Sequence, residues 1–132
     1  EMPATVLDMG TGTGILAILA EKLGAQNVLA IDIEPWSVEN TIENASRNNC
    51  SRIEAICGDV DLVERKVDLI LANINKNVLK AHLDSYANIL NDKGVVLLSG
   101  FFKTDVDEII SCANQVGLKK NRILNLKLLV RY

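Results

Sequence analysis

The sequence has few of the residues that would mark a metalloprotein or a disulfide-rich protein. Its 132 residues include one histidine, His82, and three cysteines, Cys50, Cys57 and Cys112, which show no CxxC spacing. One histidine excludes a histidine-rich metal site, so no metal is expected. An odd number of scattered cysteines argues against a disulfide framework and predicts reduced thiols in the cytoplasm. We expect His82 to have only a plain surface or half-buried role.

The chain also lacks a long apolar run and an excess of positive charge. No run reaches the roughly 18 residues of a membrane span, and no signal peptide precedes the first predicted strand. Both features predict a cytoplasmic protein without a membrane partner. The net charge of −3 argues against a general nucleic-acid binder. A basic group near the end is interpreted as a solvated edge, with RNA contact as the alternative: Lys119, Lys120, Arg122, Lys127 and Arg131.

Apolar runs alternate with amphipathic segments along the whole chain, which has no internal repeat, low-complexity tract or linker. This alternation is typical of βαβ units and predicts an α/β domain with a parallel sheet, formed by residues 1–132 as one domain. The expected strands are 5–9, 27–33, 52–57, 67–72 and 95–99, and the expected helices are 15–23, 35–48, 76–90 and 103–116. Residues 91–94 are expected to form a turn, and 118–124 with 126–132 an antiparallel hairpin.

The chemistry begins at the turn after the first strand, where Gly10, Gly12 and Gly14 alternate with Thr11 and Thr13. Glycines allow positive φ and let a ligand lie against the main chain. The helix that follows points its free N–H groups at the same ligand. A strand, glycine turn and helix in this order predict a nucleotide cradle, for which an ordinary βα turn is the alternative.

Asp32 ends the second apolar run and is the candidate acceptor for the two ribose hydroxyls of a nucleoside held at this turn. Glu34 is the competing acid, because alternate residues of a strand share a face. A dinucleotide is the rival ligand, since the glycines loosely match its pattern. Asp8 argues against a dinucleotide, because a pyrophosphate would meet its negative charge. A cationic, phosphate-free nucleoside, S-adenosylmethionine, suits Asp8, the glycines and Asp32 better than NAD.

Three further sets of residues follow the later strands. A carboxylate or backbone group of Gly58-Asp59 can meet the adenine amino group, although a plain turn is the alternative. Ile33 or Trp36 can cover an adenine face. Asn73 follows the most apolar strand, where its amide oxygen can orient an amine nucleophile. Asn75 is interpreted either in the same way or as a cap of the next helix.

Several segments together resemble the class I S-adenosylmethionine-dependent methyltransferases, and most closely the ribosomal protein L11 methyltransferase family. They are VLDMGTGTGILA from Val6, AIDIEP from Ala30, Gly58-Asp59, DLILANI from Asp68 and LLSG from Leu97. The resemblance implies a doubly wound, mostly parallel seven-stranded sheet whose last strand is antiparallel. It also implies cofactor contacts at Gly10, Asp32 and Asn73, and methylation of lysine and N-terminal amines of L11.

The chain departs from the family in three ways. The family carries an N-terminal domain that recognises L11 and a linking segment, and both are absent here, so we expect a fragment. Residues 73–77 read NINKN where members usually continue ANILA. The last hairpin is short and lacks a Trp. An RNA or small-molecule methyltransferase and a non-catalytic cofactor-binding domain therefore remain as alternatives. Asn73 is the candidate catalytic residue, and no general base is evident.

Overall fold

The computed structural model describes the backbone of residues 2–124 and 127–131 and the side chains of residues 2–120. Its strands are β1 (Thr5–Met9), β2 (Asn27–Asp32), β3 (Ile53–Cys57), β4 (Val67–Asn73), β5 (Leu90–Ser99), β6 (Lys119–Leu124) and β7 (Lys127–Arg131). Its α-helices are α1 (Ile15–Lys22), α2 (Pro35–Arg47), α3 (Lys76–Ile89) and α4 (Val106–Gln115). Two 3₁₀ turns, η1 (Val60–Leu62) and η2 (Lys103–Asp105), complete the described elements.

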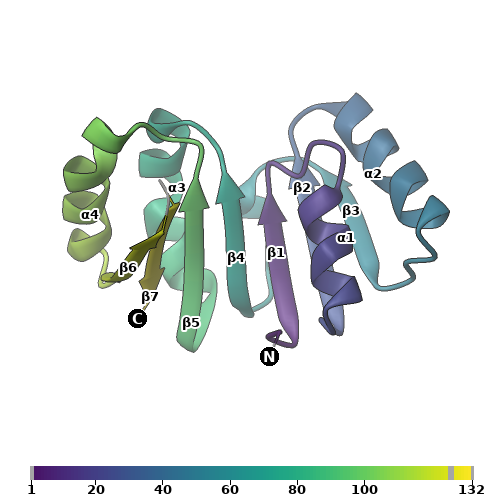
Figure 1. The fold of residues 1–132 in the computed structure, drawn as a ribbon, viewed down its shortest axis with the longest axis horizontal. Helices are drawn as coiled ribbons and strands as arrows, with labels where there is room; N and C mark the ends of the chain where they lie inside the picture. The colour runs from purple at the N-terminus through teal and green to yellow at the C-terminus, as the bar shows by residue number, and fades with distance from the viewer. Residues whose placement is uncertain (1, 125–126, 132) are drawn as a thin grey trace.

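The strands lie in the order β3-β2-β1-β4-β5-β7-β6 (Figure 1). The five strands from β3 to β5 are parallel, and β7 runs antiparallel to both β5 and β6. The predicted α/β class, parallel sheet and C-terminal antiparallel hairpin are therefore confirmed. Leu126 and Tyr132, which were included in the predicted hairpin, lie outside the described residues.

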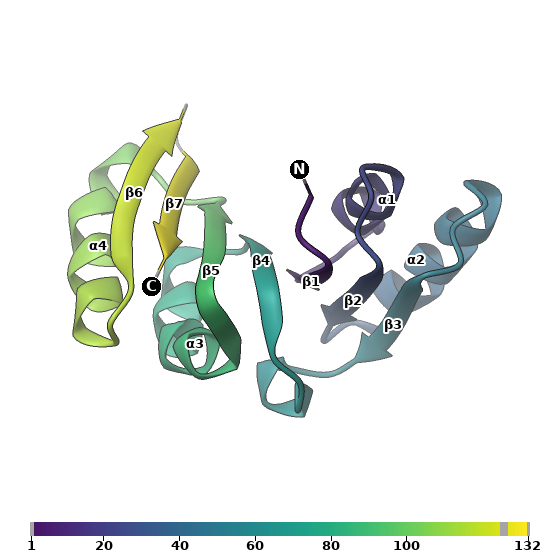
Figure 2. The same cartoon turned by 90° about the horizontal axis from the view of Figure 1, so that it is seen from below.

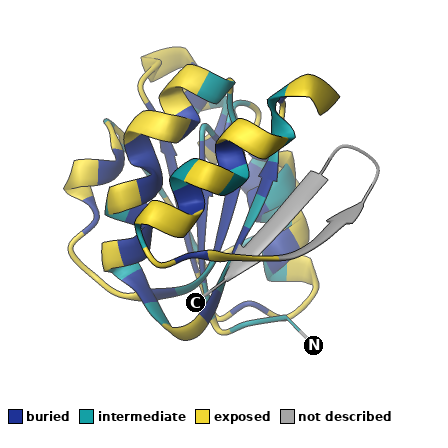
Figure 3. Ribbon diagram, turned by 90° about the vertical axis from the view of Figure 1, so that its left-hand side faces the viewer, coloured by how far each residue is buried: buried dark blue, intermediate teal, exposed yellow. Residues whose placement is uncertain are grey.

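Helices cover both faces of the sheet, with α1 and α2 on one face and α3 and α4 on the other (Figure 2). The alternation of side chains along a strand produces two cores. Leu7 and Ile31 join the core beneath α3 and α4, whereas Val6 and Ala30 join the smaller core beneath α1. The helices turn their buried residues toward the sheet and their exposed residues outward (Figure 3). Among the described residues, no helix is long and apolar enough to span a membrane.

The predicted turn at residues 91–94 is wrong, because β5 already begins at Leu90. Buried Leu90 pairs with Val67, and the register then shifts so that Val95 pairs with Leu69. The extra residues form an irregularity in which Lys93 has a φ of 66°. The segment therefore has turn-like local chemistry, but its neighbours hold it in the sheet.

Two helices also differ from expectation. In α2, Trp36 and Ile42 are large apolar residues of an amphipathic segment, yet their side chains are 58% and 57% exposed. The buried face of α2 instead carries small and polar residues, Ser37, Thr41 and Ala45. The predicted helix 103–116 begins with the separate turn η2, and the α-helix itself starts at Val106.

Candidate functional site

The candidate site lies at the carboxyl ends of β1, β2 and β4. The chain after β1 passes to one side of the sheet and the chain after β4 to the other, so a crevice opens between these neighbouring strands. Gly10 follows β1, Asp32 ends β2, and Asn73 ends β4. Residues that are far apart in the sequence therefore meet at one edge of the sheet.

The glycine turn has the left-handed backbone that its sequence predicts. Gly10, Gly12 and Gly14 have φ values of 76°, 58° and 85°. The N–H groups of Gly10 and Thr11 both donate to the carbonyl of Ile31, at 2.8 and 3.0 Å, and join the turn to β2. A Cβ atom on Gly10 would lie 2.8 Å from Cγ2 of Ile74. Glycine is therefore required at position 10 for conformation and for space.

Helix α2 holds the other side of this turn. Thr41 Oγ1 donates to the carbonyl of Gly12 at 3.1 Å, and Asn44 Nδ2 donates to the carbonyl of Thr13 at 2.9 Å. A Cβ atom on Gly14 would lie 2.8 Å from Cγ2 of Thr41. Neither of these α2 residues could be predicted as part of the site, because nothing in the local sequence of α2 shows that they face the turn.

Asp32 links the glycine turn to the start of α2. Its Oδ2 accepts the N–H of Gly12 at 2.9 Å, and its Oδ1 accepts the N–H of Glu34 at 3.0 Å. A carboxylate has about four acceptor positions, so each oxygen can still accept one hydroxyl. Asp32 is buried, whereas Glu34 is exposed and its side chain caps no helix N–H. The geometry therefore favours Asp32 over Glu34 as the anchor of a ligand.

Asp8 is the most buried acid of the site, with 2% of its surface exposed. Burial raises its pKa to about 6, the nearby charge of Asp32 acts in the same direction, and the hydrogen bond from Thr11 opposes the shift. That bond joins Thr11 Oγ1 to Asp8 Oδ2 at 2.8 Å. At neutral pH the carboxyl is mostly ionised, so a buried negative charge lies beside the glycine turn.

Two hollows meet at Gly10. One, of about 460 Å³, is lined by Asp32, Ile33 and Asp59 among others, and the second, of about 380 Å³, is lined by Asp8, Thr11 and Asn73 among others. Ile33 is 65% exposed and forms an apolar edge of the first hollow, whereas Trp36 does not line it. No lysine or arginine of the described residues lines either hollow. The site is therefore apolar and acidic.

Gly58 and Asp59 follow β3, and Asp59 lines the first hollow. The N–H of Gly58 donates to the carbonyl of Asp32 at 2.9 Å. Asp59 Oδ1 accepts the N–H of Val60 at 2.7 Å and lies 2.8 Å from His82 Nε2. His82 is only 8% exposed, so the expectation that it has a plain surface or half-buried role is wrong.

The segment after β4 carries Asn73 and Asn75. Asn73 is exposed, and a Cβ atom on Gly100 would lie 2.7 Å from its Oδ1, so the chain after β5 passes directly beside it. Asn75 Oδ1 accepts the N–H of Val78 at 3.0 Å and caps α3. Of the two interpretations of Asn75, the structure therefore supports the cap.

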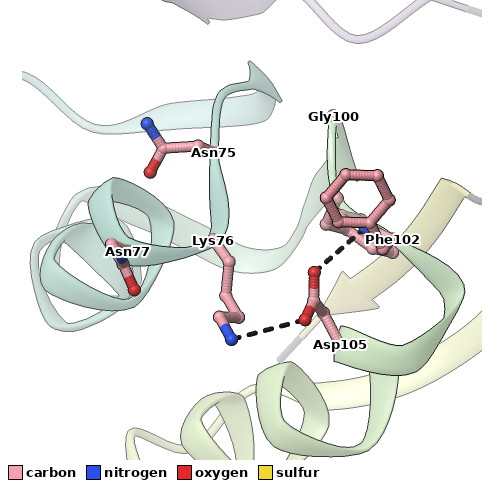
Figure 4. Close-up of a pocket in the computed structure, with 7 residues that line it drawn as sticks. Asn75, Lys76, Asn77, Gly100, Phe102 and Asp105 are labelled. Carbon is pink, nitrogen blue, oxygen red and sulfur yellow. Dashed lines mark hydrogen bonds and ion pairs between the residues drawn. The ribbon is translucent and has the colours of Figure 1, made fainter.

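A third hollow, of about 300 Å³, lies between the start of α3 and the turn η2 (Figure 4). Phe102, which is 77% exposed, forms one wall. Lys76 points toward Asp105 and pairs with it at 3.3 Å, and Asp105 accepts the N–H of Phe102 at 3.0 Å (Figure 4). Gly100, which is packed beside Asn73, also lines this hollow.

The switch-point crevice, glycine turn and strand-end acid define a domain with the Rossmann-like fold of the class I methyltransferases. The family described as ribosomal protein L11 methyltransferase (PrmA) matches residues 1–127. The chain therefore belongs to the ribosomal protein L11 methyltransferase family.

Individual relatives carry the same name. The chain is 49% identical over 115 residues to "Ribosomal protein L11 methyltransferase" of Porphyromonas gingivalis, covering 86% of this chain and 40% of the relative. It is 41% identical to the protein of that name from Phocaeicola vulgatus, covering 87% of this chain and 42% of the relative. The chain thus spans about two fifths of the length of these relatives.

A solved structure agrees with this assignment. The crystal structure of ribosomal protein L11 methylase from Lactobacillus delbrueckii subsp. bulgaricus matches with a TM-score of 0.89 and 34% identity, over 97% of this chain and 68% of that one. A structure titled as M. jannaschii TYW2 in complex with AdoMet, with a TM-score of 0.73 and 21% identity over 98% of this chain and 67% of that one, shares the fold.

Proposed function

We propose that this chain binds S-adenosylmethionine and is the catalytic domain of an N-methyltransferase that acts in the cytoplasm on lysine and N-terminal amines of ribosomal protein L11. The observation that carries the proposal is the pair of acids beside the glycine turn, Asp32 in the first hollow and Asp8 in the second. Among the described residues, no lysine or arginine lines either hollow. Family membership and the names of the relatives support the choice of substrate.

The chemistry of the site suits a cationic nucleoside. Asp32 would accept the ribose hydroxyls, Ile33 would cover one face of the adenine, and Gly58-Asp59 would meet its amino group. Asp8, Gly10, Thr11, Gly12, Gly14 and Asn73 would surround the remainder of the molecule, which carries the sulfonium. The pyrophosphate of NAD would instead face buried negative charge, and no described lysine or arginine lines either hollow to neutralise it.

When bound, S-adenosylmethionine supplies a methyl group that its positive sulfur already activates. The chain mainly has to bring an amine into line, and alignment alone can contribute a large part of a rate enhancement. The Asn73 amide oxygen would accept an N–H of the amine and aim its lone pair at the crevice. A lysine amine, with a pKa of about 10.4 in water, must lose a proton before it attacks. We assign no residue as general base.

The third hollow supports a side-chain amine as the substrate. It lies beside Gly100, which contacts Asn73, and the exposed ring of Phe102 offers an apolar wall to an alkyl chain. The chain spans only about 40% of the P. gingivalis relative, so we propose that residues 1–132 are the cofactor-binding domain and that recognition of L11 needs further sequence.

The direct experiment joins this chain to the part of the P. gingivalis relative that it does not cover, and incubates the joined protein with a radiolabelled methyl donor and either L11 or bulk RNA, with the full-length P. gingivalis relative as the positive control. Label on lysine and N-terminal amines of L11 is the expected result. Label on RNA alone would support the RNA methyltransferase alternative. In that case the binding of the protein to RNA should also weaken as the salt concentration rises. Cofactor binding without any label, at L11 concentrations at which the relative is active, would support a binding domain without turnover.

A variant at Asn73 tests the proposed orientation of the amine. Asn73→Ala removes an exposed amide and no buried apolar volume, so the fold should be unchanged by circular dichroism. Single-turnover transfer to L11 should fall on the order of 100-fold, whereas cofactor affinity should change much less. Normal transfer by the folded variant would reduce Asn73 to a turn residue.

A further inference from the structure

We propose that His82 is a positioning residue that holds Asp59 so that its free carboxylate oxygen, Oδ2, selects a purine with a 6-amino group over one with a 6-oxo group. This inference rests on the proposed cofactor site. It adds a specificity role for a histidine that belongs to a different element from the glycine turn and from the two acids Asp8 and Asp32.

The Asp59 carboxylate is held on one oxygen by two donors. Its Oδ1 accepts the N–H of Val60 from η1 at 2.7 Å and contacts Nε2 of His82 from α3 at 2.8 Å. Within the described residues, Oδ2 has no hydrogen-bond partner. The Asp59 side chain is 52% exposed and, with His82, lines the hollow that also contains Asp32. Because two elements hold Oδ1, the direction of Oδ2 is determined as well.

Tyr86 determines which nitrogen of His82 carries the proton. The Tyr86 hydroxyl lies 3.1 Å from Nδ1 of His82, one helical turn away, and Tyr86 has no exposed surface. Burial, together with the charge of Asp59, raises the pKa of Tyr86, so its hydroxyl keeps its proton. A buried hydroxyl needs a hydrogen-bond partner, and Nδ1 provides one as an acceptor. The neutral ring then carries its proton on Nε2 and donates it to Asp59.

The consequence for a ligand follows from the polarity of purines. An acceptor-only carboxylate oxygen attracts the N–H of a 6-amino group and repels the oxygen of a 6-oxo group. This discrimination depends on a fixed Oδ2, because a carboxylate that can rotate would turn toward water. Asp59 supplies the negative charge, whereas His82 and Val60 fix the direction in which its Oδ2 points.

The test compares two variants of similar polarity. In His82→Gln the side-chain amide nitrogen can lie near the position of Nε2, whereas in His82→Asn the shorter amide cannot reach Asp59. Calorimetry measures binding of S-adenosylhomocysteine and of S-inosylhomocysteine, in which a carbonyl oxygen replaces the amino group. The wild-type chain should bind the inosyl compound about tenfold more weakly or worse. The Gln variant should keep most of this ratio, and the Asn variant should reduce it to about threefold or less.

The possible results distinguish a failure of the His82 role from a failure of the proposed cofactor site. If the wild-type chain binds neither compound, the proposed cofactor site is wrong. If it prefers the adenosyl compound and His82→Asn keeps the full ratio, His82 has no positioning role although the cofactor site stands.

A measurement on the wild-type chain does not depend on the folding of any variant. Nitrogen-15 NMR of the imidazole should show a proton on Nε2, and a neutral ring protonated on Nδ1 alone would overturn the inference.

Discussion

At the scale of single residues, the site combines two acids that have different environments. Asp32 receives two backbone N–H bonds and remains at the edge of a hollow. Asp8 lies in the interior, and among the described side chains its hydrogen-bond donor is the Thr11 hydroxyl. A carboxylate kept buried without a cation is costly for the fold. The position of Asp8 beside the glycine turn is therefore better explained by a positively charged ligand than by stability.

The first prediction concerns Asp32. Asp32→Ala should weaken binding of S-adenosylhomocysteine by about 10- to 100-fold, because a charged acceptor for ribose hydroxyls contributes about 1.5–3 kcal/mol. Glu34→Ala is the matched control, because its exposed side chain lies two residues away and accepts no N–H of the helix that follows the turn. Calorimetry on both variants decides between the acids. Unchanged affinity in Asp32→Ala with a loss in Glu34→Ala would transfer the ribose role to Glu34.

The second prediction is a pH dependence of stability caused by Asp8. Its pKa is raised from 3.8 to about 6 in the folded chain, so the folded state binds more protons than the unfolded state between these values. The free energy of unfolding should therefore fall as pH rises from about 4 to 6, with a contribution of roughly 3 kcal/mol from this group.

Urea unfolding at several pH values measures this contribution. Asp8→Asn cannot titrate, so its free energy of unfolding should fall less across this range than that of the wild-type chain. Equal slopes for the two proteins between pH 4 and 6 would contradict the assignment of the shift to Asp8.

At the scale of elements, the glycine turn is rigid because β2 and α2 both hold it. Ile31 accepts two N–H groups of the turn, and Thr41 and Asn44 donate to two of its carbonyls. The peptide groups that would contact a ligand are thus fixed before the ligand arrives. Such preorganisation lowers the conformational entropy that binding must overcome.

The third prediction compares two glycines with positive φ. Gly14→Ala should destabilise the chain more than Gly24→Ala, because a methyl group at position 14 meets Thr41 at 2.8 Å, whereas position 24 has open space. Both variants carry the backbone strain, of about 1–2 kcal/mol, and only Gly14→Ala adds the clash. Thermal unfolding measures the difference. Equal melting temperatures for the two variants would show that Thr41 does not confine the turn.

The elements that the sequence predicts well are those whose apolar runs are buried on both sides. β1 has its predicted bounds, and β2 and β4 differ by one residue. β5 was predicted too short because Asn, Asp, Lys and Gly favour a turn, while pairing of Leu90 with Val67 keeps the segment in the sheet. The buried face of α2 was missed because Thr41 is buried by its bond to the glycine turn rather than by its apolarity.

The same distinction applies to the candidate site. Asp8, Asp32 and the glycines could be found because each lies at the end of a recognisable strand. The role of His82 could not be found, because its partner Asp59 lies before η1, far from His82 in the sequence. Only the spacing of one helical turn between His82 and Tyr86 was visible in the sequence. Contacts between elements depend on packing that periodicity does not encode.

At the scale of the whole molecule, the topology explains why one edge of the sheet carries the chemistry. Parallel strands bring all their carboxyl ends to the same edge, and the change of direction between β1 and β4 opens a crevice there. The fold is shared by enzymes with very different substrates, so it cannot by itself identify L11 as the substrate. What the site itself predicts most directly is the ligand of the crevice.

Isothermal titration calorimetry of this chain with S-adenosylhomocysteine and with NAD tests that central claim most directly. The two ligands share adenosine, but only NAD brings a pyrophosphate to the turn beside Asp8. We predict that S-adenosylhomocysteine binds with one-to-one stoichiometry and that NAD binds at least about tenfold more weakly. Tighter binding of NAD than of S-adenosylhomocysteine would contradict the account of this site as one for S-adenosylmethionine.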